Sequence, residues 1–269
     1  KRAFYFSSLK QINFPDALET IEDEAFRSSK IEAAAFGDKL KSIGKEAFGY
    51  CSSLQSIDFG ASVEIIQDDA FYNCEAFTSV ILPDSVTHIG SGAFASCGGV
   101  EDLIVPDRVE YLGMEPFPSQ WVKRQSGDFV LLHGKFLIAC NLQSERIVIP
   151  DTVQAICCEF SHTQSIDEIV IPGSVKTILA GTIDSVRKVV IEEGVEKIEA
   201  YAIETFSNNP VESIQIPSSV KEIEDRAVFE SNGGLGRPDN ATGFILMAKK
   251  DSYAVQWARA LNITYDYIE

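Results

Sequence analysis

The sequence predicts a solenoid of short parallel strands, and three observations support this fold class. An apolar pattern recurs along the chain, with copies 22 or 23 residues apart in the first half. Proline or glycine follows the first apolar segment of most copies, which ends a strand because proline cannot donate to a ladder. No single copy can bury its own apolar face, so the copies must stack on one another.

Nine copies share the pattern, and the copy beginning at Phe77 shows it most clearly. Its apolar residues occupy positions one, four and six, which indicates a short strand ended by Pro83. Val86-x-x-Ile89 is predicted to form a second short strand, and Ala93-Phe94 to close a turn of helix. Ala3-Phe4 looks like the tail of a tenth copy. The copies begin at residues 9, 31, 54, 77 and 100 and, after an interruption, at 144, 166, 186 and 211.

The later copies depart from the pattern at the turn. Ala-Phe is lost after Leu112, Ile156 and Ile178, and it becomes Ala202-Ile203 or Ala227-Val228 in the last two copies. We therefore expect the least regular stacking between residues 112 and 210.

The frame L-x-x-I-x-I-P-x-x-V-x-x-I-G-x-x-A-F-x-x-C resembles the BspA-type leucine-rich repeats of bacterial surface proteins. Residues 77–97 match it best, and the resemblance covers about residues 3–116 and 144–230. It implies a right-handed leucine-rich-repeat solenoid, β-rich, with short helical or 3-10 turns. Residues 128–139 resemble the family's inserted hairpin, and residues 244–267 resemble its closing strand-helix-strand element.

The residues themselves support both additional elements. His133-Gly134 lies between two apolar runs and suits a two-residue hairpin turn, since glycine adopts positive φ without strain. Ala254, Trp257, Ala258 and Leu261 fall on one helical face, which Asp251 or Ser252 can cap. We expect one domain over 1–269, with N-terminal repeats (1–116), an insertion with a hairpin (117–143), C-terminal repeats (144–235) and a C-terminal cap (236–269).

The charge balance argues against two classes of partner. Lys and Arg number 23 against 40 Asp and Glu, giving a formal net charge of −17. Such a surface repels nucleic-acid phosphates and anionic lipids. No apolar run approaches a membrane span, and no leader opens the chain. We expect an acidic, soluble domain or ectodomain without membrane insertion, trimmed at its N-terminus.

The cysteines and histidines do not form a recognisable catalytic or metal site. Cys51, Cys74 and Cys97 each close Ala-Phe-x-x-Cys and should form one column of small buried thiols, because Ser29 and Ser7 occupy the same position in earlier copies. Cys157-Cys158 with His162 lacks the spacing of a zinc site. No nucleophile motif surrounds His88, His133 or His162. We expect no enzyme activity, no metal and no cofactor.

One column of residues is a candidate binding site. The fifth position of each copy lies between two buried strand residues, so its side chain should point outwards. In five successive copies this position is aliphatic, and the third position beside it stays polar. An apolar stripe with a polar border is typical of a protein-binding patch, although β-branched residues also suit strands that bind nothing. The candidate stripe is Ile81, Ile104, Val148, Val170 and Val190.

The resemblance implies a surface-exposed or secreted bacterial protein that takes part in adhesion to host matrix proteins and to other cells. We therefore expect a non-enzymatic, monomeric adhesion or protein-binding domain at the cell surface or outside the cell. Its partners would be host or bacterial surface proteins. The alternatives are a carbohydrate-binding part of a nutrient-capture system and a structural spacer. The only tryptophans, Trp121 and Trp257, are assigned to the insertion and the cap helix, which favours protein over sugar.

Overall fold

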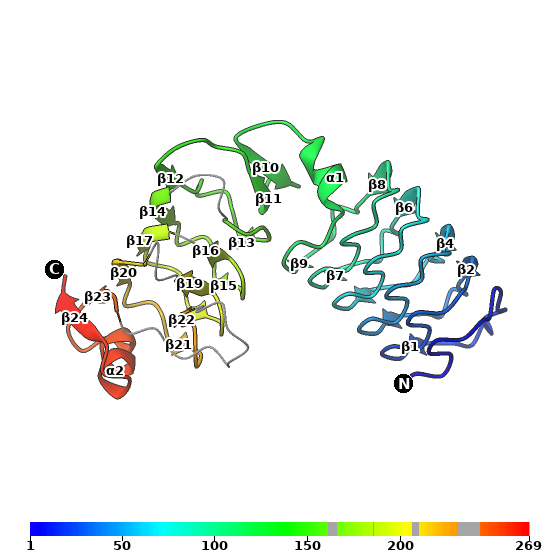
Figure 1. Ribbon diagram of the computed structural model, residues 1–269, viewed down its shortest axis with the longest axis horizontal. Helices are drawn as coiled ribbons and strands as arrows, with labels where there is room; N and C mark the ends of the chain where they lie inside the picture. Colours follow the sequence, from blue (N-terminus) through cyan, green and yellow to red (C-terminus); the bar gives the residue numbers. More distant parts are fainter. Residues whose placement is uncertain (161–165, 185, 206–209, 231–242, 269) are drawn as a thin grey trace. The chain divides into compact units, whose positions relative to one another are not determined.

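The structure is a computed structural model that describes residues 1–160, 166–184, 186–205, 210–230 and 243–268. Its contacts divide the chain into two compact units, Lys1–Ser126 and Gly127–Glu269 (Figure 1). The sequence predicts a single domain over 1–269, and the boundary between the units falls inside the insertion predicted for 117–143. Each unit is a stack of coils joined by parallel strands.

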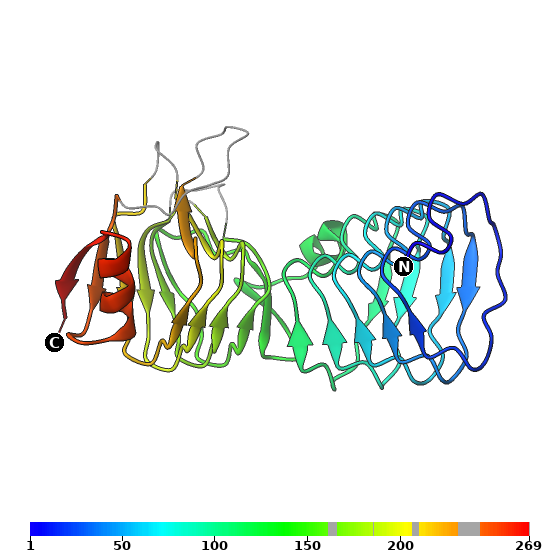
Figure 2. The ribbon, with the colours of Figure 1, turned by 90° about the horizontal axis from the view of Figure 1, so that it is seen from below.

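Unit 1 contains the predicted second strand of each copy as one five-stranded parallel sheet (Figure 2). Its strands are β1 (Thr20–Ile21), β3 (Ser42–Ile43), β5 (Ile65–Ile66), β7 (His88–Ile89) and β9 (Tyr111–Leu112). The first strands form two parallel pairs, β2 (Ala33–Ala35) with β4 (Ser56–Asp58), and β6 (Ser79–Ile81) with β8 (Asp102–Ile104). The buried residue of each second strand pairs with its equivalent one coil on, as in Ile43 with Ile66, so the predicted register is confirmed.

The segment around each Ala-Phe is a run of tight turns, so the prediction of a helical turn is wrong. Two residues of the first complete turn segment have positive φ, Glu24 at 55° and Ser28 at 59°, which an α-helix excludes. Backbone N–H groups alternate between two kinds of acceptor. Ala25 N donates within its own coil, to Glu22 O at 3.2 Å, whereas Phe26 N donates to Ala47 O of the next coil at 2.7 Å. The turns therefore join neighbouring coils as a strand would.

A column of phenylalanine rings fills the interior of unit 1. Successive rings are nearly parallel, with centroids 5.0 to 5.3 Å apart, and they belong to Phe4, Phe26, Phe48, Phe71 and Phe94. Phe94 N donates to Pro116 O at 2.8 Å, just as Phe71 N donates to Ala93 O. Phe117, which is buried, therefore continues the register with Pro116 in the place of alanine. Ala-Phe is thus replaced by Pro-Phe after Leu112, and the stacking, which we expect to be less regular from this point, keeps its register here.

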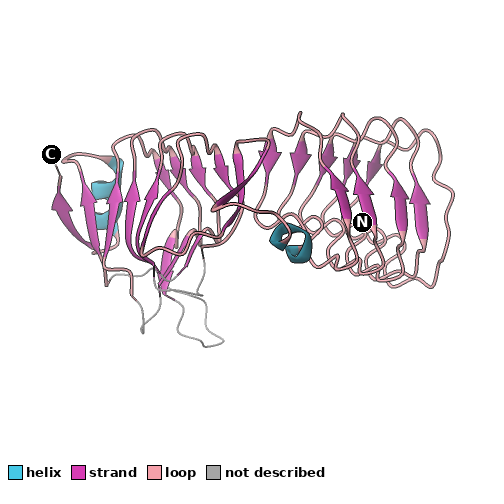
Figure 3. Ribbon diagram, turned by 90° about the horizontal axis from the view of Figure 1, so that it is seen from above, coloured by secondary structure: helices cyan, strands magenta, loops and turns pink. Residues whose placement is uncertain are grey.

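The helix α1 (Ser119–Lys123) ends unit 1, and a hairpin begins unit 2 (Figure 3). The hairpin strands β10 (Phe129–Leu132) and β11 (Phe136–Cys140) are antiparallel. Lys135 N donates to Leu132 O at 3.2 Å, and the central residues of this turn, His133 and Gly134, both have positive φ. The predicted hairpin and its turn are confirmed. Strand β11 also pairs in parallel with β13 (Ala155–Ile156), so the hairpin supplies the second strand of a coil.

Unit 2 contains three further parallel sheets. The largest consists of β12 (Arg146–Val148), β14 (Ile166–Ile171), β17 (Val186–Ile191), β20 (Ser213–Ile216), β23 (Ile245–Ala248) and β24 (Thr264–Tyr267). The second strands are β15 (Thr177–Ile178), β18 (Lys197–Ile198) and β21 (Glu222–Ile223). After Ile178, Ile198 and Ile223, where Ala-Phe is missing, segments that begin with a β-branched residue form a third strand of the coil, which suits such side chains. These third strands are β16 (Ile183–Asp184), β19 (Ile203–Thr205) and β22 (Val228–Glu230).

The predicted cap is present at the end of unit 2. Strand β23 pairs with β20 on one side and with β24 on the other. Between them lies α2 (Tyr253–Ala260), and the Ser252 side chain accepts a hydrogen bond from Val255 N at its start. Ala254, Val255 and Ala258 are fully buried, and Trp257 packs against the same core. This element covers the apolar interior that the last coil would otherwise expose.

Candidate binding surface

The three-residue strands of unit 1 hold the candidate site because they alternate strictly between inside and outside. The middle residue of β6, Val80, is buried, whereas Ile81 beside it is 60% exposed. Ile104 occupies the same place in β8 and is 55% exposed, and the two residues are paired in register. Their neighbours at the third position, Ser79 and Asp102, are polar and also paired. We call Ile81 and Ile104 the aliphatic ridge.

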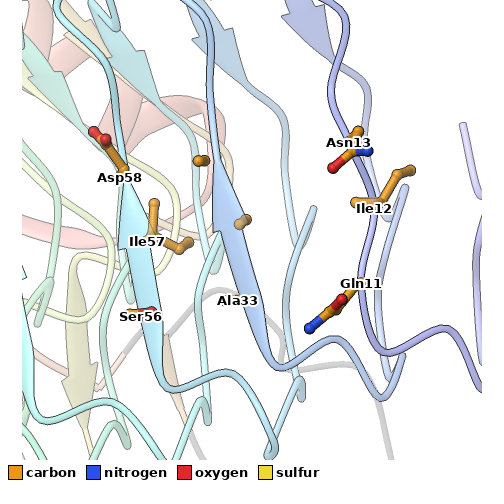
Figure 4. A pocket seen from close by; sticks show the side chains of 9 residues that line it. Gln11, Ile12, Asn13, Ala33, Ser56, Ile57 and Asp58 are labelled. Atoms are coloured by element: carbon orange, nitrogen blue, oxygen red, sulfur yellow. The ribbon is translucent and has the colours of Figure 1, made fainter.

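A hollow of about 440 Å³ lies on the same side of the preceding coils (Figure 4). Its floor is β2, whose three residues are all alanine, and Ala33 and Ala35 point outwards. Longer polar side chains stand on either side, Gln11 and Asn13 from one coil and Ser56 and Asp58 from the other. The hollow therefore results from small side chains between rows of larger ones.

Asp58 stands between the hollow and the ridge. It pairs in register with Ala35, and its strand β4 also contacts β6, which carries Ile81. One carboxylate oxygen of Asp58 accepts a hydrogen bond from Gly60 N at 3.0 Å. This bond orients the carboxylate at the edge of the hollow. A single surface of unit 1 thus combines a depression, a fixed negative charge and two exposed isoleucines.

The part of the candidate stripe in unit 2 is only partly exposed. Val148 is 46% exposed, but Val170 is 5% exposed and Val190 is half-buried. The prediction that Val170 points into solvent is therefore wrong. The reason lies in the sheet, because Val170 is paired with Val148 on one side and with Val190 on the other. Branched side chains on both sides shield Val170, whereas Val148 lies on the first strand of the sheet and is covered from one side.

The polar border of the unit 2 column is an ion-pair row. Arg146 pairs with Glu168 one strand on, and both occupy the third position of their copies. Lys188 follows in the same register, with Nζ 3.7 Å from an oxygen of Asp167. Paired charges leave this border close to neutral, and exposed pairs of this kind add little stability. The contrast between an apolar column and a polar border is therefore present in both units.

The cysteine column of unit 1 is structural. Cys51, Cys74 and Cys97 are free and fully buried, as predicted. Each thiol donates to the carbonyl of a column phenylalanine in the preceding coil, at 3.0 Å for Cys51 to Phe26, 3.2 Å for Cys74 to Phe48 and 3.0 Å for Cys97 to Phe71. Burial raises the pKa of Cys51, and it raises the pKa of Cys74 well above the usual thiol value. Cys51 and Cys74 are therefore unsuited to nucleophilic or metal chemistry at neutral pH.

His88 and His133, the two histidines that the structure describes, are in different units. His88 stacks on Tyr111 with ring centroids 5.9 Å apart, and His133 is in the hairpin turn. Cys157 and Cys158 are buried, and His162, the third member of the predicted cluster, lies outside the described residues. Across the part of the chain that the structure describes, no three His, Cys, Asp or Glu side chains come together as metal ligands.

Sequence reasoning missed an aromatic surface on the turns of unit 1. Phe6 is 67% exposed and Tyr50 is 42% exposed, and both are the second residue after a column phenylalanine. Tyr5 and Tyr72 are the first residue after one. The signal is present in the repeat frame, since these two positions are adjacent to the most regular residue of the copy. Tryptophan alone is therefore a poor guide to the exposed aromatic side chains of this chain.

Stacked coils 22 or 23 residues apart in unit 1, joined by parallel strands around an aliphatic and phenylalanine core, define a β-solenoid of the leucine-rich-repeat kind. The chain belongs to the family of BspA type leucine rich repeat regions, whose model matches residues 1–120 and 135–235. The predicted resemblance is thus confirmed. No curated protein is similar enough to count as a match.

Several solved structures of bacterial proteins are similar to this chain. A leucine rich cell surface protein from Faecalibacterium prausnitzii is 20% identical, with a TM-score of 0.42 over 88% of this chain; the chain spans 64% of that protein's length. A leucine-rich repeat protein from Bacteroides ovatus is 18% identical, with a TM-score of 0.40 over 95% of this chain and 83% of its own. The pneumococcal vaccine antigen PcpA is 17% identical, with a TM-score of 0.40 over 100% of this chain and 75% of its own. Of the helices in the described ranges, none has the length and apolar character needed to cross a membrane.

Proposed function

We propose that this protein is a non-enzymatic adhesion domain at the bacterial cell surface that binds host matrix or cell-surface proteins through the exposed strand face of unit 1. The observation that carries the proposal is the aliphatic ridge, two isoleucines 60% and 55% exposed and paired in register. Apolar side chains gathered on a surface in this way are typical of sites that a partner covers. Membership of the BspA-type family, whose repeats occur in bacterial surface proteins, supports the location.

The hollow and Asp58 add specificity to this surface. An interface needs a well-packed centre with a polar rim, and a side chain of the partner can enter the hollow while its apolar neighbours cover the ridge. Burying one Ile side chain is worth about 1.5–3 kcal/mol in transfer terms, before ordering costs. Asp58 favours a partner with a basic side chain at this point, in keeping with the net charge of −17.

The test is binding of the whole protein to a panel of purified extracellular-matrix proteins, measured by surface plasmon resonance. The double variant Ile81→Asp/Ile104→Asp should bind its partner at least tenfold more weakly and should keep the wild-type melting temperature. Ile245→Asp is the matched control, because Ile245 is 45% exposed on β23 of the other unit. Equal loss of binding in the control, or normal binding of the double variant, would contradict the proposal.

Filling the hollow is an independent check of the same surface. Ala35→Leu places a larger side chain on the floor without changing any charge, and Ala35 is exposed, so the fold should tolerate it. We expect weaker binding of the same partner, by about threefold or more. Asp58→Asn should also weaken binding, and the difference from wild type should shrink at high salt because charge attraction is screened. Unchanged binding of both variants would limit the proposal to the ridge.

A further inference from the structure

The aromatic surface on the turns of unit 1 lies on a different part of each coil from the ridge and the hollow. It consists of Tyr5, Phe6, Arg27, Tyr50 and Tyr72, which we call the tyrosine–arginine row. Backbone hydrogen bonds set its register, because Phe6 N donates to Arg27 O at 3.0 Å and Ser28 N to Gly49 O at 2.8 Å. Phe6, Ser28 and Tyr50 thus occupy the same position in three successive coils.

The side chains of the row hold one another in place. The Arg27 guanidinium lies over the Tyr50 ring at 4.8 Å and over the Tyr5 ring at 5.8 Å, and it donates to the Tyr5 hydroxyl at 3.1 Å. Glu46 forms an ion pair with Arg27 on the same surface. The rings of Tyr50 and Tyr72 meet edge to face at 5.3 Å. A surface ordered in this way loses little side-chain entropy when a partner binds.

Two of these aromatic residues occupy positions that do not favour them. The backbone φ is 53° at Phe6 and 61° at Tyr50, in the left-handed region that glycine and asparagine adopt more readily. Asn73 and Ser28 occupy the equivalent position in neighbouring coils, at 58° and 59°. A bulky exposed ring in this conformation costs free energy and adds no core packing. The same φ recurs at this position in other coils, including Ser96 at 60°, so the conformation belongs to the repeat, and the choice of a bulky exposed ring for it is what points to binding.

The spacing of the two exposed rings indicates the kind of ligand. Phe6 and Tyr50 are two coils apart, which is about 9.6 Å for parallel strands at their usual separation. A polyproline II helix has three residues per turn and advances about 9.3 Å in that turn. Side chains on one face of such a helix therefore repeat at nearly the spacing of the rings. The equivalent position in the coil between them is Ser28, which has a small side chain.

We propose that the tyrosine–arginine row is a second binding surface, separate from the ridge, and that it binds a proline-rich protein segment in the polyproline II conformation. Prolines at every third residue pack on Phe6 and Tyr50. In this proposal the hydroxyls of Tyr5 and Tyr72, together with Arg27, donate hydrogen bonds to the backbone carbonyls of the segment, which a polyproline II helix leaves free.

The test uses the whole protein on an array of 12-residue peptides with proline at every third position, beside a matched array with alanine in place of proline. Fluorescence anisotropy with the best peptide of each array then gives the affinities. Wild-type protein should bind the proline peptide at least tenfold more tightly than its alanine counterpart. The double variant Phe6→Asn/Tyr50→Asn should lose at least tenfold in affinity while its melting temperature stays the same or rises, since asparagine suits the backbone at both positions.

Two controls separate this surface from others. Tyr201→Asn changes an exposed tyrosine with a φ of 62° in unit 2 and should leave peptide affinity unchanged. Ile81→Asp/Ile104→Asp should also leave it unchanged, so this proposal and the ridge proposal can fail independently. Equal binding of proline and alanine peptides, or normal binding by the asparagine double variant, would overturn the proposal. A third outcome would also overturn it. If wild-type protein binds a glycan array, the asparagine double variant does not, and neither binds the proline peptides, then the row is a sugar site.

Discussion

The ring of Phe48 stacks on the ring of Phe71 one coil further on, with centroids 5.3 Å apart and planes 10° from parallel. Phe71 stacks on Phe94 in the same way, at 5.2 Å. Phe48 and Phe71 are therefore each packed on two sides by equivalent rings, and both are fully buried. The coils of unit 1 are joined through this interior column as well as through their backbone hydrogen bonds.

Replacing a central ring should be costly. Phe71→Ala leaves a cavity between two rings, and we expect the free energy of unfolding to fall by about 3–5 kcal/mol. Urea denaturation followed by the fluorescence of Trp121, which contacts Phe117 in unit 1, measures the effect where it occurs. Phe6→Asn removes an exposed phenylalanine and is the control, with an expected change below about 0.5 kcal/mol. Similar losses in the two variants would show that the column is not the main support of unit 1.

The buried thiols should resist labelling until unit 1 unfolds. Native protein should react with a thiol reagent at Cys140 first, because it is only half-buried. Cys51 and Cys74 should stay unmodified even at mildly alkaline pH, since burial raises their pKa and suppresses the reactive thiolate. All six thiols should react after denaturation. Rapid native labelling of Cys74, detected by mass spectrometry, would contradict the burial of this column.

Asp69 should limit stability at neutral pH. Its pKa is raised, chiefly because partial burial disfavours the charged form, with Glu46 and Asp68 acting in the same direction and Lys45 opposing them. A carboxyl whose pKa is higher in the folded state than in the unfolded state destabilises the fold when ionised, and this penalty disappears as the pH falls through the folded-state pKa. Asp69→Asn should therefore raise the melting temperature at pH 7 but not at pH 3. The gain should stay below about 1 kcal/mol, because solvent screens a partly exposed charge.

The backbone supports this substitution, because φ at residue 69 is 54° and asparagine accepts that conformation. Asp68→Asn is the matched control. Asp68 accepts a hydrogen bond from Ser91 N at 2.9 Å and lies 3.9 Å from Lys45 Nζ, so neutralising it should not stabilise the protein. A higher melting temperature in the Asp68 variant at pH 7 would show that overall acidity, and not the site of Asp69, sets the effect.

Removing the cap should expose unit 2 to aggregation. Deleting residues 244–269 removes β23, α2 and β24, and it leaves β20 with an unpaired edge and an open apolar interior. Unpaired edge strands are templates for association, so we expect loss of soluble monomer in size-exclusion chromatography. The smaller change Val255→Asp places a charge on the buried face of α2 and should act in the same direction. A monomeric deletion variant with an unchanged melting curve would mean that the cap is dispensable.

The interior of this protein could be predicted from the sequence, because the buried positions recur at a regular spacing along the chain. The second-strand isoleucines and the thiol column lie where the repeat frame places them, and the hairpin turns at His133-Gly134 as these two residues predict. The exposure of the fifth-position side chains is harder to predict, since it depends on which strands lie on either side of each residue in the sheet. Val148 and Val170 have the same residue type and the same place in the frame, yet one begins a sheet and the other is enclosed by it.

The conformation of the turns is the other feature that the sequence did not predict. Alanine has a high helix propensity, so Ala-Phe suggests a turn of helix. Hydrogen bonds from these turns to the next coil outweigh that propensity. The role of β11 as a coil strand also could not be read from the frame, because Leu137 lies only 19 residues before Ile156, its partner in the parallel pair. In both cases contacts between distant residues determine the local structure.

The regular periodicity of unit 1 has a consequence for how such a chain can change in length. Residues 48 and 71 occupy equivalent places, so excising residues 49–71 would join Phe48 directly to Tyr72 and leave every column in phase. The ring, thiol and strand columns would each lose one member and close up. A single added residue fits only where no column residue is displaced, as between Cys51 and Leu54, which are one residue further apart than Ser29 and Ile31 in the preceding copy. Duplication and deletion of whole coils are therefore the changes in length that this architecture accommodates most readily.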